Sequence, residues 1–169
     1  MKTNYSEINS FLSFKLDDED FAVHVKSVLN ILEMIKVTKV PKAPSYMKGV
    51  INLRGEVLPV IDLRLKFGMS ETLYTDKTCI VVMEVNIEDQ NVLIGTLVDE
   101  VSSVMEFDKN EILPPPSIGS KFKSEFIDGM AKVGDKFFMI LNIDKVYTGD
   151  ELTILRKSSE NMNKKNSNK

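Results

Sequence analysis

The sequence contains one β-rich pattern twice, and this repeat limits the folds that the chain can adopt. The stretch GVINLRGEVLPVIDL, which starts at Gly49, aligns with GMAKVGDKFFMILNI, which starts at Gly129. Upstream, AVHVKSVLNI from Ala22 aligns with GTLVDEVSSV from Gly95. Repetition of this kind predicts two similar β units that meet at a groove. Common β patterning alone can also produce such an alignment, so the duplication is a hypothesis.

Short strands bounded by turn residues account for most of the chain. Three hairpins are indicated by paired apolar runs: 11–16 with 21–25, 79–85 with 91–98, and 126–133 with 136–143. Residues 25–32 have apolar side chains at helical spacing, but one helical turn followed by a strand fits there as well as a longer helix. The number and shortness of the strands predict an all-β fold built from small barrels.

A charged hairpin tip lies between two apolar runs in residues 49–64, GVINLRGEVLPVIDLR. Gly55 can adopt the positive φ that a tight tip often requires, which leaves Arg54 in water. Arg54 is then expected either to contact a partner or to brace its own barrel through carbonyl groups of a neighbouring loop. Pro59 cannot donate a hydrogen bond to a neighbouring strand, which predicts that its strand lies at a sheet edge or contains a bulge.

Composition and charge argue against several classes of protein. The net charge is −3, but residues 156–169 hold five basic residues and one acid, which leaves 17 basic and 24 acidic residues in the rest of the chain. Such an acidic body argues against a nucleic-acid-binding protein. The absence of a long apolar stretch or a signal-peptide core predicts a soluble, cytoplasmic protein without membrane insertion. The single cysteine, Cys79, is expected to be a buried hydrophobic residue.

No group of residues in the sequence indicates catalysis or a cofactor. His24 is the only histidine and falls on the polar phase of a strand, with no serine or cysteine partner in a recognisable motif. One histidine and one cysteine cannot complete a closed metal site. No glycine-rich loop precedes a helix, and the acidic pairs are typical of solvated turns. We therefore expect no catalytic residue, metal or cofactor, and a protein that acts by binding.

Five apolar residues form a repeat-related set beside the turns that join the strands: Val28, Ile31, Leu97, Val98 and Val101. The repeat alignment pairs Val28 with Val101 and Ile31 with Val104. Each residue taken alone is consistent with an ordinary core position. Taken as a set on either side of a groove, they predict a binding site for an apolar segment of a partner.

Three segments together resemble the CheW family, the coupling proteins of bacterial chemotaxis: GVINLRGEVLPVIDLRLKFG, VLIGTLVDEVSSV with the following ILPPP, and FIDGMAKVGDKFFMILNIDKV. The resemblance runs from about residue 6 to residue 147, in the order and spacing of the family. It implies two five-stranded SH3-like β-barrels side by side, with short connecting helices. The first barrel would span about 15–67 and the second about 76–147, with terminal segments crossing between them.

The residues that follow this domain, 148–169, are expected to form two further segments. Residues 148–157 are expected to form a short helix and residues 158–169 a disordered basic tail, because the tail has too few apolar residues to offset the entropy of ordering.

The resemblance also implies a function and partners. Family members are non-enzymatic scaffolds whose groove holds the cytoplasmic tip of a methyl-accepting chemoreceptor, while the first barrel packs against the regulatory domain of the histidine kinase CheA. Carried onto this chain, the five apolar residues would form the receptor-binding groove, and Arg54 and Gly55 a functionally sensitive tip. No kinase-binding residue is assigned. The protein would lie in the cytoplasm at membrane receptor arrays. An adaptor of a non-flagellar signalling pathway, a small-barrel nucleic-acid binder and an enzyme that uses the acidic turns are the alternatives.

Overall fold

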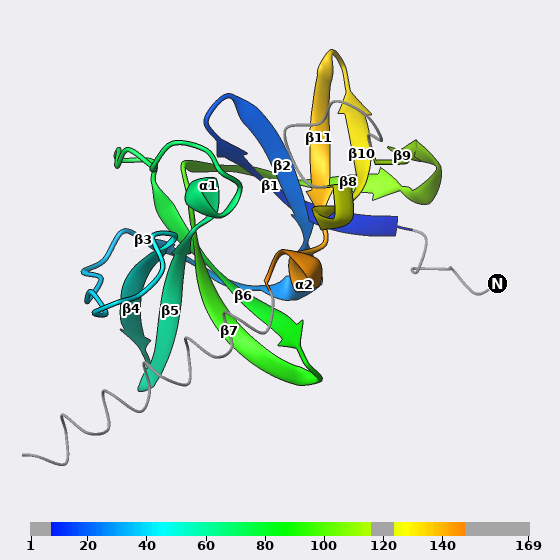
Figure 1. Cartoon of the computed structure of the whole chain (residues 1–169). Coiled ribbons are helices and arrows are strands. Elements are labelled where there is room, and N and C mark those ends of the chain that lie inside the picture. The colour runs from blue at the N-terminus through cyan, green and yellow to red at the C-terminus, as the bar shows by residue number, and fades with distance from the viewer. Residues whose placement is uncertain (1–7, 116–123, 148–169) are drawn as a thin grey trace, which may run out of the picture.

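The fold consists of two β-sheets connected by short helical turns (Figure 1). It is a computed structural model that describes residues 8–115 and 124–147. The helix expected over 148–157 and the tail expected over 158–169 lie outside the described residues. Within the described part of the chain, no helix has the length and apolar character needed to span a membrane.

The first sheet, sheet A, has six strands in the order β8-β1-β2-β11-β10-β9. Its strands are β1 (Ile8–Leu16), β2 (Glu19–His24), β8 (Glu100–Asp108), β9 (Ile112–Leu113), β10 (Ile127–Val133) and β11 (Lys136–Leu141). The β1–β2 and β10–β11 pairs are antiparallel, which confirms two of the predicted hairpins. Strand β11 also pairs with β2 in parallel, so the N-terminal hairpin is joined directly to the C-terminal one.

The second sheet, sheet B, has five strands in the order β3-β6-β7-β5-β4. Its strands are β3 (Val28–Glu33), β4 (Met47–Leu53), β5 (Glu56–Asp62), β6 (Cys79–Ile87) and β7 (Gln90–Val98). The antiparallel β6–β7 pair confirms the third predicted hairpin. In the described residues, short helices follow or connect the strands: η2 (Val25–Ser27), α1 (Leu63–Lys66), η3 (Lys109–Glu111), η4 (Ser124–Phe126) and, after β11, α2 (Ile143–Val146). The turn-then-strand interpretation of residues 25–32 is therefore confirmed.

The all-β class is confirmed, but strand pairing does not close either sheet into a five-stranded barrel. In the described residues, sheet A ends at β8 and β9, and sheet B ends at β3 and β4. The chain that leaves β3 meets β4 only at one bridge, between Thr38 and Val50. Pro41 and Pro44 follow, and proline lacks the N–H that further pairing needs. Each sheet also combines strands from both of the expected ranges, 15–67 and 76–147, because the β1–β2 and β6–β7 hairpins pair with strands from the other half of the chain.

The internal repeat is confirmed by the strand register. In sheet B, Val60 of β5 lies opposite Gly95 of β7 in a parallel pair. In sheet A, Ile140 of β11 lies opposite Ala22 of β2, also in a parallel pair. The sequence alignment equates these same residues, Val60 with Ile140 and Gly95 with Ala22, so the two units repeat in space as well as in sequence.

Glycine occupies equivalent positions in the two units for a steric reason. A Cβ atom on Gly49 would lie 2.1 Å from the carbonyl oxygen of Thr38, and one on Gly129 would lie 2.7 Å from that of Leu113. Both glycines follow a register shift, in β4 and β10 respectively. Only a residue without a side chain allows the neighbouring backbone to approach this closely.

The prediction that the Pro59 strand lies at an edge or is bulged is wrong. Strand β5 lies between β4 and β7, and the register shift of the β4–β5 pair lies in β4, between Met47 and Gly49. Pairing of β5 with β7 begins at Val60, one residue after the proline. Pro59 is therefore accommodated inside the sheet because it precedes the parallel ladder.

Three apolar clusters hold the described part of the chain together. The largest contains buried residues of both sheets, including Phe14 and Phe21 of sheet A and Val81 and Met83 of sheet B, and we call it the shared core. Two smaller clusters belong to sheet B and sheet A alone. Cys79 is buried in the shared core, as the sequence predicted, and burial raises the pKa of its thiol. The shared core fixes the two sheets against each other and so positions the residues at their edges.

Candidate protein-binding site

Strand β3 carries two of the predicted site residues on the face that continues from the shared core. Val28 lies opposite Met83 of β6, and Ile31 lies opposite Val81. Both β6 residues are fully buried members of the shared core. Val28 is half-buried and packs against that core, whereas Ile31 is 45% exposed. The apolar face of sheet B therefore extends from the core to the surface at this strand.

Strand β8 repeats this arrangement in sheet A. Val101 lies opposite Phe14 of β1, and Val104 lies opposite Leu12. Phe14 and Leu12 both belong to the shared core. Val101 is half-buried against the core, and Val104 is 62% exposed. The two units thus place equivalent apolar residues at equivalent edges.

We refer to Val28, Ile31, Val101 and Val104 as the paired-edge surface. Both strands that carry it are sheet edges: among the described residues, β3 pairs only with β6 and β8 only with β1. Half-buried Val28 and Val101 form its base, and exposed Ile31 and Val104 its outer part. Exposed apolar residues that continue a core are typical of a surface that a partner covers.

Leu97 and Val98 do not belong to this surface, contrary to the sequence expectation. Both are fully buried. Their strand, β7, is the central strand of sheet B, so side chains on both of its faces are covered. Leu97 lies in the core of sheet B alone and Val98 in the shared core. Val104 is not among the five residues that the sequence predicted for the binding site. The repeat alignment could have identified it, because it pairs Val104 with Ile31.

The hairpin tip between β4 and β5 presents Arg54 to solvent. Arg54 and Gly55 both have positive φ, 52° and 87°. The backbone N–H of Gly55 donates to Oδ1 of Asn52 at 2.9 Å, which fixes the turn. Within residues 8–115 and 124–147, the Arg54 guanidinium has no hydrogen bond or ion pair. Among the described residues, no contact of the Arg54 guanidinium supports the interpretation that it braces its own barrel.

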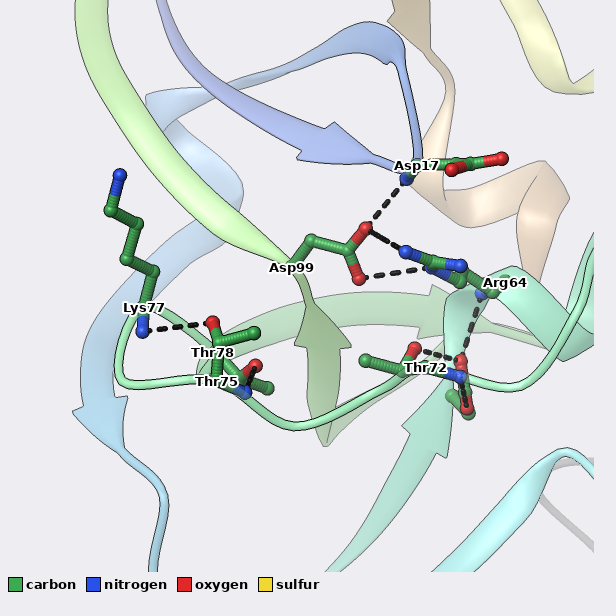
Figure 2. A network of polar contacts seen from close by, with 8 residues as sticks. Asp17, Arg64, Thr72, Thr75, Lys77, Thr78 and Asp99 are labelled. Atoms are coloured by element: carbon green, nitrogen blue, oxygen red, sulfur yellow. Dashed lines mark hydrogen bonds and ion pairs between the residues drawn. The ribbon is translucent and has the colours of Figure 1, made fainter.

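A polar junction joins the two sheets where the chain passes from β7 to β8 (Figure 2). Asp99 lies between β7 of sheet B and β8 of sheet A. Its carboxylate accepts hydrogen bonds from Nε of Arg64, at 3.0 Å to each oxygen, and from Nη2 of the same side chain. The N–H of Asp17, in the β1–β2 turn, donates to the same carboxylate at 2.6 Å. The hydrogen bonds with Asp99 raise the pKa of the Arg64 guanidinium above its ordinary value. Together with the Asp17 bond they fix the point at which the chain crosses between the sheets.

A second carboxylate anchors the loop after α1. Asp62 is fully buried and accepts hydrogen bonds from the hydroxyl and the N–H of Thr72, at 2.8 and 3.1 Å. It also accepts from the N–H of Arg64 at 3.0 Å, and Nζ of Lys48 lies 3.9 Å away. A buried carboxylate is tolerated only when its oxygens have such partners. The acidic and basic residues of the PVIDLR motif therefore have structural roles, which the sequence did not reveal.

His24 also has a structural role. Its Nδ1 accepts a hydrogen bond from the N–H of Lys26 at 3.1 Å, and this bond caps η2. Burial and then the charge of Lys26 lower the pKa of the imidazole. Across the part of the chain that the structure describes, His, Cys, Asp and Glu side chains form no cluster suited to a metal ion.

Comparisons with known proteins agree with this architecture. The model of the CheW-like domain matches residues 10–151. The chain is 32% identical to the chemotaxis protein CheW of Rhizobium meliloti over 140 residues, which cover 83% of this chain and 88% of the relative. It is 31% identical to CheW of Thermotoga maritima over 156 residues, 91% of this chain and 97% of the relative.

A solved structure gives the same result for the fold. The crystal structure of the scaffolding protein TtCheW from Thermoanaerobacter tengcongensis superposes with a TM-score of 0.73 at 31% identity, and the match covers 82% of this chain and 92% of that one. The family model matches most of the chain, and the fold and two-unit arrangement agree with it. This chain belongs to the CheW family.

Proposed function

We propose that this protein couples methyl-accepting chemoreceptors to the histidine kinase CheA. The family is one of non-enzymatic scaffolds of chemotaxis. The observation that carries the proposal for this chain is the paired-edge surface, because it presents apolar side chains from two equivalent sheet edges. Exposed apolar residues of this kind suit the binding of a partner protein.

The receptor partner is assigned to the paired-edge surface. Ile31 and Val104 have the exposed area that a contact needs, whereas Val28 and Val101 support them from the core side. The cytoplasmic tip of a chemoreceptor would supply the apolar segment that covers all four. Burying each exposed apolar side chain contributes up to about 1.5–3 kcal/mol.

Arg54 is assigned a contact with a partner. Its guanidinium is unpaired among the described residues, while the turn that holds its backbone is fixed by Gly55 and Asn52. A guanidinium has five donors in a planar fork, which suits carboxylate or carbonyl groups of another protein. Separate measurements of receptor binding and of kinase binding, each with an Arg54 variant, decide which of the two partners Arg54 contacts.

Residues 6–147 are proposed to act as one domain that sits at receptor arrays in the cytoplasm. The exchange of hairpins between the two halves supports this, because neither half has a complete sheet of its own. Several weak contacts suffice in such an array, since each bound partner raises the effective concentration of the next.

A pull-down from extract of the source organism tests the proposal. The tagged chain should retain a histidine kinase and methyl-accepting receptors, identified by mass spectrometry, and a tag-only column should retain neither. Enrichment of nucleic acid or of a metabolic enzyme complex in place of both partners would contradict the proposal.

A further inference from the structure

The connection between β3 and β4 shows a regular three-residue period. From residue 35 to residue 43, two exposed residues are followed each time by one half-buried residue. The half-buried residues are Val37, Val40 and Ala43, and they pack against the apolar cores. Each is preceded by an exposed lysine: Lys36, Lys39 and Lys42. We call these three side chains the lysine row.

The backbone of this connection is held at two points. Thr38 and Val50 exchange two backbone hydrogen bonds, of 2.9 and 2.8 Å. Farther along, the N–H of Met47 donates to the carbonyl of Pro44 at 3.0 Å. These bonds and the packing of Val37, Val40 and Ala43 against the apolar cores hold the backbone that carries the three lysines.

The lysine row is a local excess of positive charge on an acidic protein. Residues 34–48 contain four lysines and no aspartate or glutamate, although the whole chain has a net charge of −3. The nearby carboxylate of Glu71 is already paired with Lys48, and its pKa is lowered mainly by that hydrogen bond and also by the charge of Lys39. In the described residues, none of the three lysines of the row has an ion pair or hydrogen bond.

We propose that the lysine row binds a short acidic segment of a partner protein. The backbone that carries the row pairs with β4 at Thr38 and turns at residues 41–42, where Lys42 has a φ of 61°. Lysine side chains are long and flexible, so the carboxylates of a short acidic segment can pair with the three ammonium groups along this bent support. Ile35, which is 42% exposed at the start of the row, offers an apolar contact next to the charges.

The shape and charge of the surface favour a short acidic peptide over other anions. A lipid surface or a long nucleic acid would face the rest of the protein as well, and residues outside the 156–169 tail hold 24 acidic against 17 basic residues. That excess repels an extended polyanion but affects a short segment little. A single row of cations also fits a linear partner better than a flat membrane surface.

This inference does not depend on the proposed coupling function. The row lies in the connection from β3 to β4 and contains none of the four residues of the paired-edge surface. A variant of the row can therefore lose its own partner while receptor binding through Ile31 and Val104 is unchanged.

Fluorescence anisotropy with labelled hexaglutamate tests the proposal. The probe is titrated with the full chain at about 0.01 M salt, where the Debye length is about 30 Å. The triple variant K36E/K39E/K42E should bind at least about tenfold more weakly than the wild type. The control K109E/K136E/K145E changes three exposed lysines in sheet A or beside it, with the same change in net charge, and should lose less than about threefold. The glutamine variant K36Q/K39Q/K42Q should also bind more weakly, and thermal melts show that each variant is folded.

Equal losses in the two glutamate triple variants would overturn the proposal, because they would show that only net charge matters. Undetectable hexaglutamate binding by the wild type would overturn it as well. Oligothymidine or phosphatidylglycerol vesicles, titrated in the same way, should bind more weakly than hexaglutamate. Tighter binding of oligothymidine or of the vesicles would overturn the proposal, because it would identify a nucleic acid or a membrane as the partner of the row.

Discussion

Arg64 of α1 binds both carboxylate oxygens of Asp99, the residue at which the chain passes from sheet B into sheet A. The two side chains are only 13% and 17% exposed. Asp17 adds a backbone hydrogen bond from the β1–β2 turn, so three distant parts of the chain meet at one carboxylate. This junction, with the shared core, sets the relative position of the two sheets and hence of the two edges that bear the paired-edge surface.

Removal of the Arg64 side chain should therefore destabilise the whole fold. Arg64→Ala leaves the Asp99 carboxylate without its charged partner in a mostly buried setting, and we expect a loss of about 2–4 kcal/mol in the free energy of unfolding. Urea denaturation followed by circular dichroism measures the loss.

The ion pair between Lys77 and Glu100 provides the matched control. It lies beside the same crossing point, but its side chains are 64% and 37% exposed and the atoms are 3.8 Å apart. Lys77→Ala should cost only about 0–1 kcal/mol. Similar losses for Lys77→Ala and Arg64→Ala would show that the Asp99 junction has no special role.

Arg54 should affect stability and signalling in opposite directions. Its φ of 52° is unfavourable for a residue other than glycine or asparagine. Arg54→Asn creates an Asn-Gly tip, the preferred pair for a two-residue turn with positive φ at both positions. We expect it to stabilise the fold by about 0.5–1 kcal/mol, while it weakens receptor-dependent control of the kinase because the guanidinium is lost.

Thermal melts and a reconstituted receptor–kinase assay separate the two effects of this substitution. Arg54→Lys keeps the positive charge and the strained φ at the turn. It should therefore retain part of the wild-type signalling, and it should be no more stable than the wild type. If Arg54→Asn signals as well as the wild type, Arg54 has no partner contact.

His24 should make the protein less stable in mildly acidic solution. Its pKa in the folded state is lowered by burial and by Lys26, whereas in the unfolded chain it is about 6.5. Below about pH 6.5 the unfolded chain therefore binds more protons at His24 than the folded protein does. Neutral His24 contributes to the free energy of unfolding above about pH 6.5, and this contribution is lost as the pH falls through the pKa of His24 in the folded state.

His24→Asn tests this pH dependence directly, because asparagine is also a good cap residue but does not titrate. Melting temperatures measured from pH 7 to pH 5 should fall more for the wild type than for the variant. Parallel curves would show that other groups, and not His24, cause the acid sensitivity.

The repeat made much of the fold predictable from sequence. Aligning Val60 with Ile140 and Ala22 with Gly95 predicted two similar β units, and the structure places these residues in parallel pairs of equivalent register. Paired apolar runs identified the β1–β2, β6–β7 and β10–β11 hairpins. The exchange of hairpins between the sheets was not predictable in this way. Local patterning specifies which residues form strands, but the pairing of strands distant in sequence depends on packing in the shared core.

The candidate site was only partly predictable for a related reason. Val28, Ile31 and Val101 lie on edge strands, whereas Leu97 and Val98 lie on a central strand that is buried on both faces. An apolar run in the sequence looks alike in an edge strand and in a central strand. The order of the strands in the sheet is needed to tell the two cases apart. The Arg64–Asp99 junction was hidden because its residues are 35 positions apart and each looks like an ordinary surface charge.

Receptor binding by variants of the paired-edge surface tests the central claim most directly. Ile31→Asp and Val104→Asp place a carboxylate where an apolar partner segment would exclude water, and Leu73→Asp makes the same change at a residue that is 78% exposed outside this surface. All three should fold, since each position is at the surface. Sedimentation with receptor-containing membranes should show that Ile31→Asp and Val104→Asp each bind at least about tenfold more weakly, about 1.4 kcal/mol, while Leu73→Asp binds as the wild type does. Folded Ile31→Asp and Val104→Asp variants that bind the receptor normally would contradict the account.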